Sequence, residues 1–234
     1  ILIYDDASSD NTQDIIKSYQ KKYPEIIKPI LSEENKYSKG IRPNPRFNWP
    51  RAKGEFIALC EGDDMWTSNK KLQFQITQML EAPKVNLSFH PVIKKDYLSD
   101  LEVIVGQCSK KHKMYDLDWV LRTSGANIFT ASIVFRKTIL KEIPINFFET
   151  APVVDHYLKI FGALNSNILF LPWPIGLYRK NLPGSWSNRI KVKRERLKYL
   201  DLHYKRLLEL KEIISNRYEK SLKKNFSRTL LKFS

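Results

Sequence analysis

Two short apolar runs in this chain each end in a group of acidic residues, and this feature constrains the fold more than any other. The run at 1–4 precedes Asp5 and Asp6, and the run at 55–60 precedes E-G-D-D at 61–64. Each acidic group precedes a segment with the period of an amphipathic helix. Strands that alternate with helices predict an α/β fold with a mostly parallel sheet flanked by helices, where ligands bind beyond the carboxyl ends of the strands.

The remaining pattern supports this fold class. Four glycine or proline breakers make 36–50 an expected ordered loop. The expected elements, in order, are a strand at 1–4, a helix through Ile15, Ile16 and Tyr19, a loop at 36–50, a strand at 55–60, a helix through Leu72, Ile76 and Met79, an approximate strand at 86–93, a short helix capped by Asp116, a strand at 127–135, a helix at 154–164 and a strand at 168–171.

The positive charge of the chain gathers at its end. Residues 189–234 hold fifteen Lys and Arg against five Asp and Glu, so this fifth of the chain carries +10 of the net charge of +15. We therefore divide the chain into a domain at 1–188 and a basic helical extension at 189–234. One apolar stripe is expected along that extension, formed by Leu197, Leu200, Tyr204, Leu207, Ile214 and Tyr218.

The cysteine count and the short apolar runs limit the cellular compartment expected for this chain. Cys60 and Cys108 cannot form a disulfide framework, which fits a reducing cytoplasm. No stretch approaches the eighteen or so apolar residues of a membrane span. The chain opens on Ile1 in an apolar run, without the charged region of a signal peptide, so we interpret it as a fragment.

Asp63 and Asp64 form a candidate metal site. Carboxylate oxygens directly after a buried strand are hard ligands that can hold Mg²⁺ or Mn²⁺ together with substrate phosphates. An ordinary turn explains the same composition equally well, because Glu-Gly-Asp-Asp suits a turn.

The other acidic positions have alternatives of their own. A calcium loop of the EF-hand type starting at Asp6 is excluded, because Asn11 and Lys17 stand where it needs glycine and glutamate. Asp155 lies among apolar residues at an expected helix start, where capping is the alternative to catalysis.

Several ordered motifs resemble the bacterial family 2 glycosyltransferases, which have the metal-dependent GT-A fold and build capsule or lipopolysaccharide chains. The resemblance covers most of 1–90 and 125–190. Its motifs are I-L-I-Y-D-D-A-S-S-D-N-T at 1–12, E-E-N-K-Y-S-K-G at 33–40, A-K-G-E-F-I-A-L-C-E-G-D-D-M-W at 52–66, Asp155 before an apolar helix, L-F-L-P-W at 169–173, L-Y-R at 177–179 and P-G-S-W-S at 183–187.

The resemblance implies an inverting transfer from a UDP- or dTDP-sugar to a hydroxyl of a glycan or lipid-linked acceptor. It implies that Asp64 binds the metal that bridges the diphosphate and that Asp155 is the general base. Nucleotide-sugar contacts are implied for Asp5, Asp6, Ser8, Asp63 and Arg179. Asp6, Asp63, Asp64 and Asp155 are then expected to converge around one pocket.

Two departures qualify the resemblance. The first strand of the family and its nucleotide-binding turn are expected before Ile1, so the sheet is expected to lack an element and the activity of this fragment is open. Asn181 stands where the family often has histidine, which leaves Arg179 or Lys180 as the phosphate contacts.

Three functions are weighed against one another. An enzyme is favoured, and a domain that binds sugar nucleotide without catalysis is the alternative. A nucleic-acid-binding module is less favoured despite the pI near 9.7, because no nucleic-acid motif is present, so no nucleic-acid partner is expected. The basic extension is interpreted either as a packed helical pair or as a surface for anionic membrane, which would place the protein on the inner face of the cell membrane.

Overall fold

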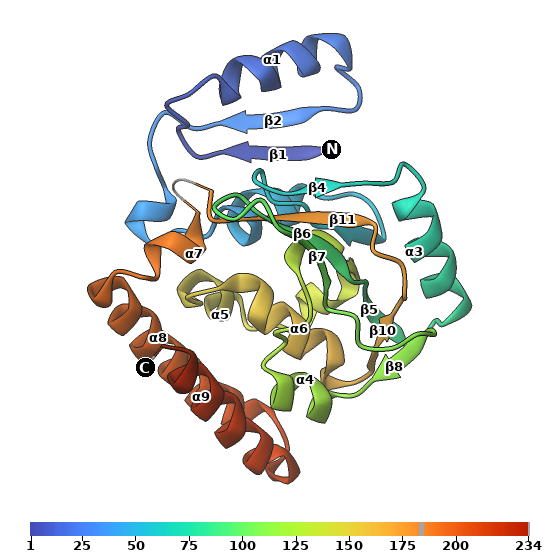
Figure 1. Ribbon diagram of the computed structural model, residues 1–234, viewed down its shortest axis with the longest axis vertical. Coiled ribbons are helices and arrows are strands. Elements are labelled where there is room, and N and C mark those ends of the chain that lie inside the picture. The colour runs from blue at the N-terminus through green and yellow to red at the C-terminus, as the bar shows by residue number, and fades with distance from the viewer. Residues whose placement is uncertain (183–184, 234) are drawn as a thin grey trace. The chain divides into compact units, whose positions relative to one another are not determined.

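The structure is a computed structural model that describes residues 1–182 and 185–233 (Figure 1). The chain forms two compact units, each described here by itself. Unit 1 contains Ile1–Gly54 and Pro144–Ala151, and unit 2 contains Glu55–Ile143 and Pro152–Ser234. The helices after residue 189 belong to unit 2, together with the second acidic group. The predicted P-G-S-W-S motif begins at 183–184, outside the described residues.

Unit 1 is built on a parallel strand pair. The expected first strand and helix are both present, and Leu2 pairs with Lys28 through to Asp5 with Leu31. The elements of unit 1 are β1 (Leu2–Asp5), α1 (Thr12–Lys22), β2 (Lys28–Leu31), η1 (Tyr37–Lys39), η2 (Asn44–Asn48), α2 (Trp49–Arg51) and α5 (Ile145–Thr150).

The segment at 36–50 differs from the expected irregular loop, because it forms three short helical turns. Pro45 and Pro50 each stand at the second position of a turn, η2 and α2. Proline suits the start of a helix, where its fixed φ is helical and its missing N–H has no partner to lose. The prolines therefore start short turns here instead of excluding regular structure.

Unit 2 contains the other expected elements. The helix predicted at 154–164 is confirmed from end to end, and the Asp116 side chain caps α4 by accepting a hydrogen bond of 2.9 Å from the Trp119 N–H. The elements are β3 (Phe56–Ala58), β4 (Met65–Trp66), α3 (Lys71–Glu81), β5 (Val85–Phe89), β6 (Val92–Asp96), β7 (Glu102–Val105), β8 (Lys113–Tyr115), α4 (Leu117–Thr123), η3 (Thr130–Ser132), β9 (Val134–Arg136), η4 (Lys137–Lys141), α6 (Val154–Leu164), β10 (Asn167–Phe170), β11 (Gly176–Lys180), α7 (Trp186–Arg189), α8 (Lys193–Ile213), η5 (Asn216–Tyr218) and α9 (Glu219–Phe233).

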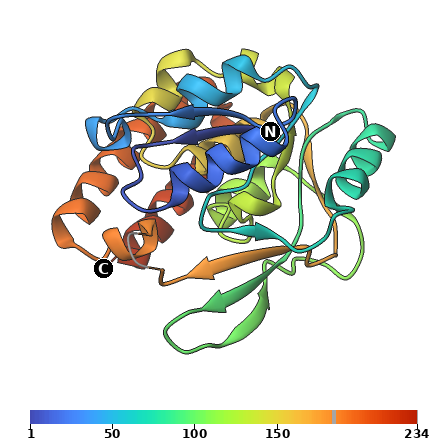
Figure 2. The same cartoon turned by 90° about the horizontal axis from the view of Figure 1, so that it is seen from above.

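The α/β class is confirmed, but the strand directions are mixed instead of mostly parallel. One sheet has the order β3-β9-β5-β10-β8 and the other the order β4-β11-β6-β7. Among the described strands of unit 2, β5 with β10 and β6 with β11 run parallel. The other pairs are antiparallel, and one of them, β6 with β7, is joined by a short turn that returns the chain without a crossover helix. Figure 2 shows this hairpin (green) beside β11 (orange).

The strand predicted at 127–135 is also shorter than expected, since its first half forms the turn η3. The Ser132 hydroxyl and N–H both donate to the Phe129 carbonyl, at 2.7 and 2.9 Å. Such local hydrogen bonds compete with strand pairing. β9 therefore begins only at Val134.

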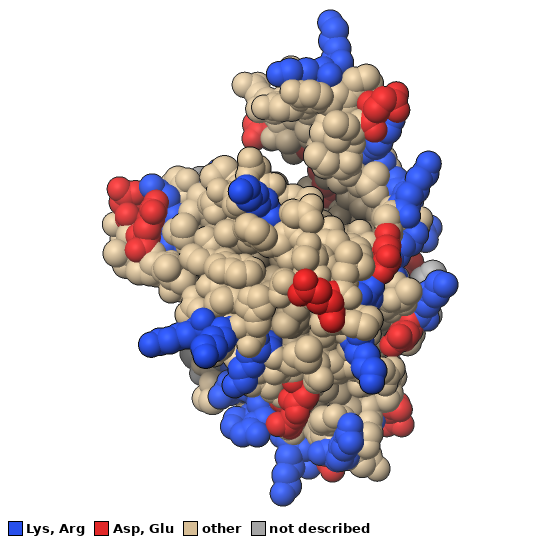
Figure 3. Space-filling model, turned by 90° about the vertical axis from the view of Figure 1, so that its right-hand side faces the viewer, with Lys and Arg blue, Asp and Glu red and all other residues tan. Residues whose placement is uncertain are grey.

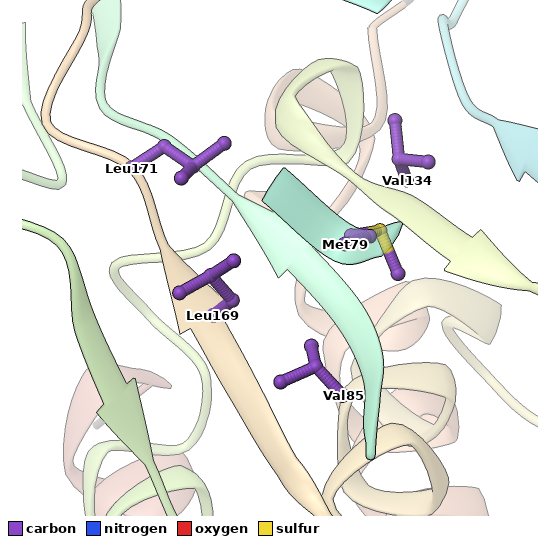
Figure 4. Close-up of a cluster of buried hydrophobic side chains, with 5 residues drawn as sticks. All are labelled: Met79, Val85, Val134, Leu169 and Leu171. Atoms are coloured by element: carbon purple, nitrogen blue, oxygen red, sulfur yellow. The ribbon is translucent and has the colours of Figure 1, made fainter. Parts of the chain in front are cut away.

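A buried apolar cluster lies between helix α3 and the five-stranded sheet. Its members lie on α3, β5, β9 and β10 and at the residue directly after β10, and none is more than 5% exposed. They are Met79, Val85, Val134, Leu169 and Leu171 (Figure 4). Burial of these side chains, at roughly 25 cal/mol per Å² of apolar surface, fixes α3 against the sheet.

The basic extension forms two helices, α8 and α9, that pack on unit 2. The expected stripe is correct only in part, because Leu207 and Ile214 are buried while Leu197 and Tyr204 are 57% and 47% exposed. The buried face of α8 includes His203, and a search for apolar residues does not predict a buried histidine. Among the described residues, no helix combines the length and the apolar character that crossing a bilayer requires.

Two histidines join α8 to α6, His203, which is buried, and His156, which is partly exposed. The rings of His156 and His203 lie 5.1 Å apart, and the Tyr157 hydroxyl is 2.7 Å from His203 Nδ1. Burial lowers the pKa of His156 to about 3, and the nearby His203 and Lys159 lower it further. Burial likewise lowers the pKa of His203 to about 4. Both rings are therefore neutral in the folded protein at pH 5 and above.

We expect the contribution of these two histidines to the free energy of unfolding to fall as the pH drops below about 6.5, the ordinary pKa of histidine. In that range the unfolded chain binds a proton at each ring and the folded chain does not, so protons favour unfolding. Each histidine contributes at most about 1.4 kcal/mol per pH unit. Urea unfolding at pH 7, 6 and 5.5 measures the slope, and His203→Asn should reduce it. An equal slope in His156→Asn and His203→Asn variants and the parent would contradict this.

Candidate functional site

Three carboxylates converge in the turn between β3 and β4. Ligand oxygens of Glu61, Asp63 and Asp64 all lie within 4.8 Å of one another. The Asp64 N–H closes the turn with a 3.0 Å hydrogen bond to the Glu61 carbonyl, and no atom lies near the position that a Gly62 side chain would take. The second acidic group of the sequence is thus a compact cluster of oxygen ligands.

Arg179 of β11 holds this turn in place. Its backbone N–H donates to Asp64 Oδ1 at 3.1 Å, and its guanidinium donates to the carbonyls of Gly62, at 3.3 Å, and of Asp63. β11 also pairs with β4, directly after the turn. Arg179 was predicted to contact phosphates; the structure places its guanidinium against the backbone of the acidic turn.

Strand β4 is fixed through buried polar contacts. Trp66 Nε1 donates to the Ala131 carbonyl at 3.0 Å, and Gln75 Nε2 donates to the Ser132 carbonyl at 2.9 Å. Lys71 is fully buried, with its ammonium 4.5 Å from the centre of the Trp66 ring, and burial lowers its pKa to about 7. These contacts therefore hold Trp66, two residues after the acidic turn, in place.

The cluster favours protonated carboxyls when no cation is bound. Burial raises the pKa of Asp64, which is 8% exposed, to about 6, and the Asp63 charge adds to this. Glu61 is exposed as a residue, yet removal of its carboxyl from water, together with the charges of Asp155 and Asp63, raises its pKa to about 8. A divalent cation relieves both effects, and an all-oxygen ligand set suits Mg²⁺ or Mn²⁺.

Asp155 lies in the first turn of α6, coupled electrostatically to Glu61. Its carboxylate accepts a 2.6 Å ion-pair bond from Lys159, whose side chain is 6% exposed. Burial raises the pKa of Asp155, but the Lys159 ammonium outweighs burial, so the pKa lies below its ordinary value. Gly125, at a φ of +58°, leaves room for Lys159: a Cβ there would lie 2.9 Å from Lys159 Cδ. Asp155 is therefore an ionised carboxylate next to the cluster.

The first acidic group orders the backbone of unit 1. Asp6 accepts hydrogen bonds from the N–H groups of Lys36 and Tyr37, at 2.7 and 2.9 Å. Asp5 accepts bonds from Gln13 Nε2 at 2.7 Å and from the N–H and hydroxyl of Ser8. These residues hold together the end of β1, the start of α1 and the turn at 36–37.

The structure thus brings together three of the predicted residues in unit 2, Asp63, Asp64 and Arg179, while Asp155 lies on α6 of the same unit and acts on the cluster through its charge on Glu61. Asp5, Asp6 and Ser8 form a cluster of their own in unit 1, and the expected convergence of Asp6 with the others stays a prediction.

The sequence prediction omitted Glu61 and Lys159. Glu61 lies two residues before Asp63. A search for adjacent aspartates finds Asp63 and Asp64 but does not include a glutamate at this spacing. Lys159 stood four residues after Asp155, the spacing of a helical ion pair. Asn181 takes a left-handed backbone, at a φ of 65°, and its amide donates to Asp96 Oδ1 at 2.8 Å.

Comparisons with known proteins agree on one family. The sequence model described as Glycosyl transferase family 2 matches residues 1–143. An uncharacterised protein of Mycobacterium tuberculosis is 32% identical over 195 residues, covering 80% of this chain and 52% of that protein. The Escherichia coli protein WfgD, named a UDP-Glc:alpha-D-GlcNAc-diphosphoundecaprenol beta-1,3-glucosyltransferase, is 28% identical over 168 residues, covering 72% of this chain and 59% of that protein. The chain spans about half the length of the curated relatives it matches.

A solved structure shares the fold. The mannosyltransferase PcManGT from Pyrobaculum calidifontis, in complex with GDP-Man and Mn²⁺, matches with a TM-score of 0.55 at 13% identity. The match covers 96% of this chain and 59% of that one. At this identity the likeness establishes the fold alone.

We expect the affinity for Mn²⁺ to rise as the pH increases from about 5.5 to 8.5. The cation must replace the protons of Asp64 and Glu61, whose pKa values are about 6 and 8, so binding strengthens as each carboxyl ionises. Electron paramagnetic resonance of free Mn²⁺ at three pH values measures the affinity. Glu61→Gln should remove the upper part of the rise, and a constant affinity across the range would contradict the assignment of these ligands.

We also expect Arg179→Met to weaken Mn²⁺ binding at least about tenfold, because the guanidinium bonds to Gly62 and Asp63 are lost and the loss of even one charged hydrogen bond costs about 1.5–3 kcal/mol. Lys94→Met, on the neighbouring strand β6, is the control. If Arg179→Met lowers the affinity for nucleotide but leaves that for Mn²⁺ unchanged, Arg179 acts on phosphates and not through the turn.

Proposed function

Because the chain belongs to glycosyl transferase family 2, we propose that it transfers a sugar, with inversion, from a nucleotide-diphosphate donor to a hydroxyl of a glycan or lipid-linked acceptor. The observation that carries the proposal is the cluster of Glu61, Asp63 and Asp64 with the ionised Asp155 next to it. The proposed role is in the synthesis of a cell-surface polysaccharide.

The relatives support the donor and acceptor classes. WfgD is named for a UDP-glucose donor and a diphosphoundecaprenol-linked acceptor, and PcManGT was solved with GDP-Man and Mn²⁺. We propose a UDP- or dTDP-sugar as the donor and Mg²⁺ or Mn²⁺ as the cofactor for this chain. The nucleotide contacts proposed for unit 1 are Asp5, Asp6 and Ser8, and Asp63 is proposed to contact the ribose or the sugar.

The proposed reaction is a single displacement. The acceptor oxygen bonds to the anomeric carbon of the sugar as the bond from that carbon to the diphosphate oxygen breaks. Asp155 takes the proton of the acceptor hydroxyl. Asp64, assisted by Glu61 and Asp63, would hold a divalent cation, which when bound neutralises negative charge on the diphosphate.

Lys159 suits Asp155 to the role of base. The ion pair keeps the carboxylate ionised although it is largely removed from water, so it can accept a proton at neutral pH. The same pair fixes the direction of the carboxylate, because Lys159 is itself buried. A base must lie within hydrogen-bond reach of the hydroxyl that it deprotonates, and a fixed carboxylate meets that requirement.

A direct assay tests this function. The protein, expressed from its complete gene, is incubated with Mn²⁺ and radiolabelled UDP-, dTDP- or GDP-sugars, with water, a free glycan or a polyprenyl-diphosphate-linked sugar as acceptor. Labelled acceptor supports the proposal. Calorimetric binding of UDP and Mn²⁺ without transfer or hydrolysis of any donor would instead indicate a domain that binds sugar nucleotide without catalysis.

We expect Asp155→Asn to lower transfer by about a hundred- to ten-thousandfold, the range of general-base catalysis, while calorimetric binding of nucleotide with Mn²⁺ is kept. Asp14→Asn is a matched control, since Asp14 also lies in the first turn of a helix and pairs with a lysine, Lys17. Normal turnover by the folded Asp155→Asn protein would show that another group is the base.

A further inference from the structure

Helix α8 carries apolar side chains on two faces. Leu207, Leu210 and His203 are buried against the rest of unit 2. On another face, Leu197, Tyr204 and Leu208 are 57%, 47% and 48% exposed. Their spacing of seven and four residues places these three in one row along the helix. A row of large apolar side chains in the middle of a solvent-facing helix surface is unusual for an isolated domain.

Exposed basic residues border this row. Helix α8 has five exposed basic residues against four exposed acids, Glu195, Asp201, Glu209 and Glu212, and Lys205 is ion-paired with Asp201. Helix α9 packs beside α8, where Tyr204 contacts Phe226 with ring centres 5.1 Å apart, and it continues the surface with Leu230, 41% exposed. The exposed basic residues are Lys193, Arg194, Lys198, Lys205 and Lys211 on α8 and Lys220, Lys223, Lys224 and Arg228 on α9. We call this the α8–α9 surface.

The charge distinguishes between possible occupants of this surface. A second copy of the chain would bring two faces of like charge together, since residues 189–234 carry a net +10, and that juxtaposition is repulsive. An apolar row with basic borders is instead the composition of helices that lie in the interface of an anionic bilayer. Figure 3 shows one face of the protein, where Lys and Arg (blue) and Asp and Glu (red) are interspersed.

We propose that the α8–α9 surface docks on an anionic lipid bilayer, with Leu197, Tyr204 and Leu208 entering the headgroup layer and the surrounding Lys and Arg contacting lipid phosphates. The biological role of this docking rests on the proposed function, because the enzyme would meet a lipid-linked acceptor at a membrane. The binding itself depends only on the surface.

The position of α8 relative to the candidate base supports this docking. The face of α8 that carries His203 contacts the start of α6. The centres of the His156 and His203 rings lie 5.1 Å apart, and the Tyr157 hydroxyl lies 2.7 Å from His203 Nδ1. Asp155 directly precedes these residues. Because α8 contacts α6 directly, docking through α8 would hold Asp155 near the bilayer surface.

Liposome flotation tests the docking without sugar or nucleotide. The protein is mixed with vesicles of phosphatidylcholine alone or with 30% phosphatidylglycerol, at low and high salt. We expect flotation only with phosphatidylglycerol, weakened by salt. The variant with Lys193→Gln, Lys198→Gln and Lys205→Gln should lose about a hundredfold in lipid affinity, and Leu197→Ser with Leu208→Ser should lose the residual binding at high salt.

The control variant changes three exposed lysines of unit 1, Lys21→Gln, Lys22→Gln and Lys53→Gln, and should float like the parent. Urea unfolding confirms that each variant is folded. No flotation of the parent at low salt, an equal loss in the control, or a dimer in light scattering that the Leu197→Ser and Leu208→Ser variant abolishes would each overturn the proposal. Because flotation and transfer are measured separately, failure of one leaves the other standing.

Discussion

The gathering of three carboxyl groups within 4.8 Å of one another is the constraint that the residues around the acidic turn of unit 2 must meet. Burial and the neighbouring charges disfavour the ionised form of Glu61 and Asp64, so the backbone of the turn needs support from outside. Here β11 holds it, through the Arg179 guanidinium on two carbonyls and through the pairing of β11 with β4. Trp66, directly after the turn, and Gln75 of α3 then donate hydrogen bonds to carbonyls of the turn η3. The position of β11 next to β4 in the four-stranded sheet therefore places Arg179 where it can support the acidic turn.

The elements that a sequence predicts well are those determined by local chemistry. The helix at Val154–Leu164 is apolar along most of its length and begins after an extended residue, so both ends could be placed. Asp116 is a strong helix cap, and it caps α4 as predicted. The acidic turn could be located because Glu-Gly-Asp-Asp suits a turn and directly follows an apolar run.

The elements that escaped prediction depend on contacts between distant residues. Strand direction is not encoded in an apolar run, so the antiparallel position of β9 between β3 and β5 could not be read from the sequence. Helix α8 is apolar on two faces, and only the fold shows that His203 and Leu207 pack while Leu197 stays exposed. The partners of Asp6, two backbone N–H groups thirty residues away, are likewise a product of the fold.

The buried pair of Asp155 and Lys159 also limits how such a site can change over generations. Loss of the acid alone leaves an ammonium with 6% of its side chain exposed and no counter-charge, a change that costs several kcal/mol, whereas loss of both partners to apolar residues is nearly neutral. Substitutions at positions 155 and 159 should therefore be inherited together. Among homologues, an apolar residue at the second position would mark a lineage that has abandoned the acid at the first.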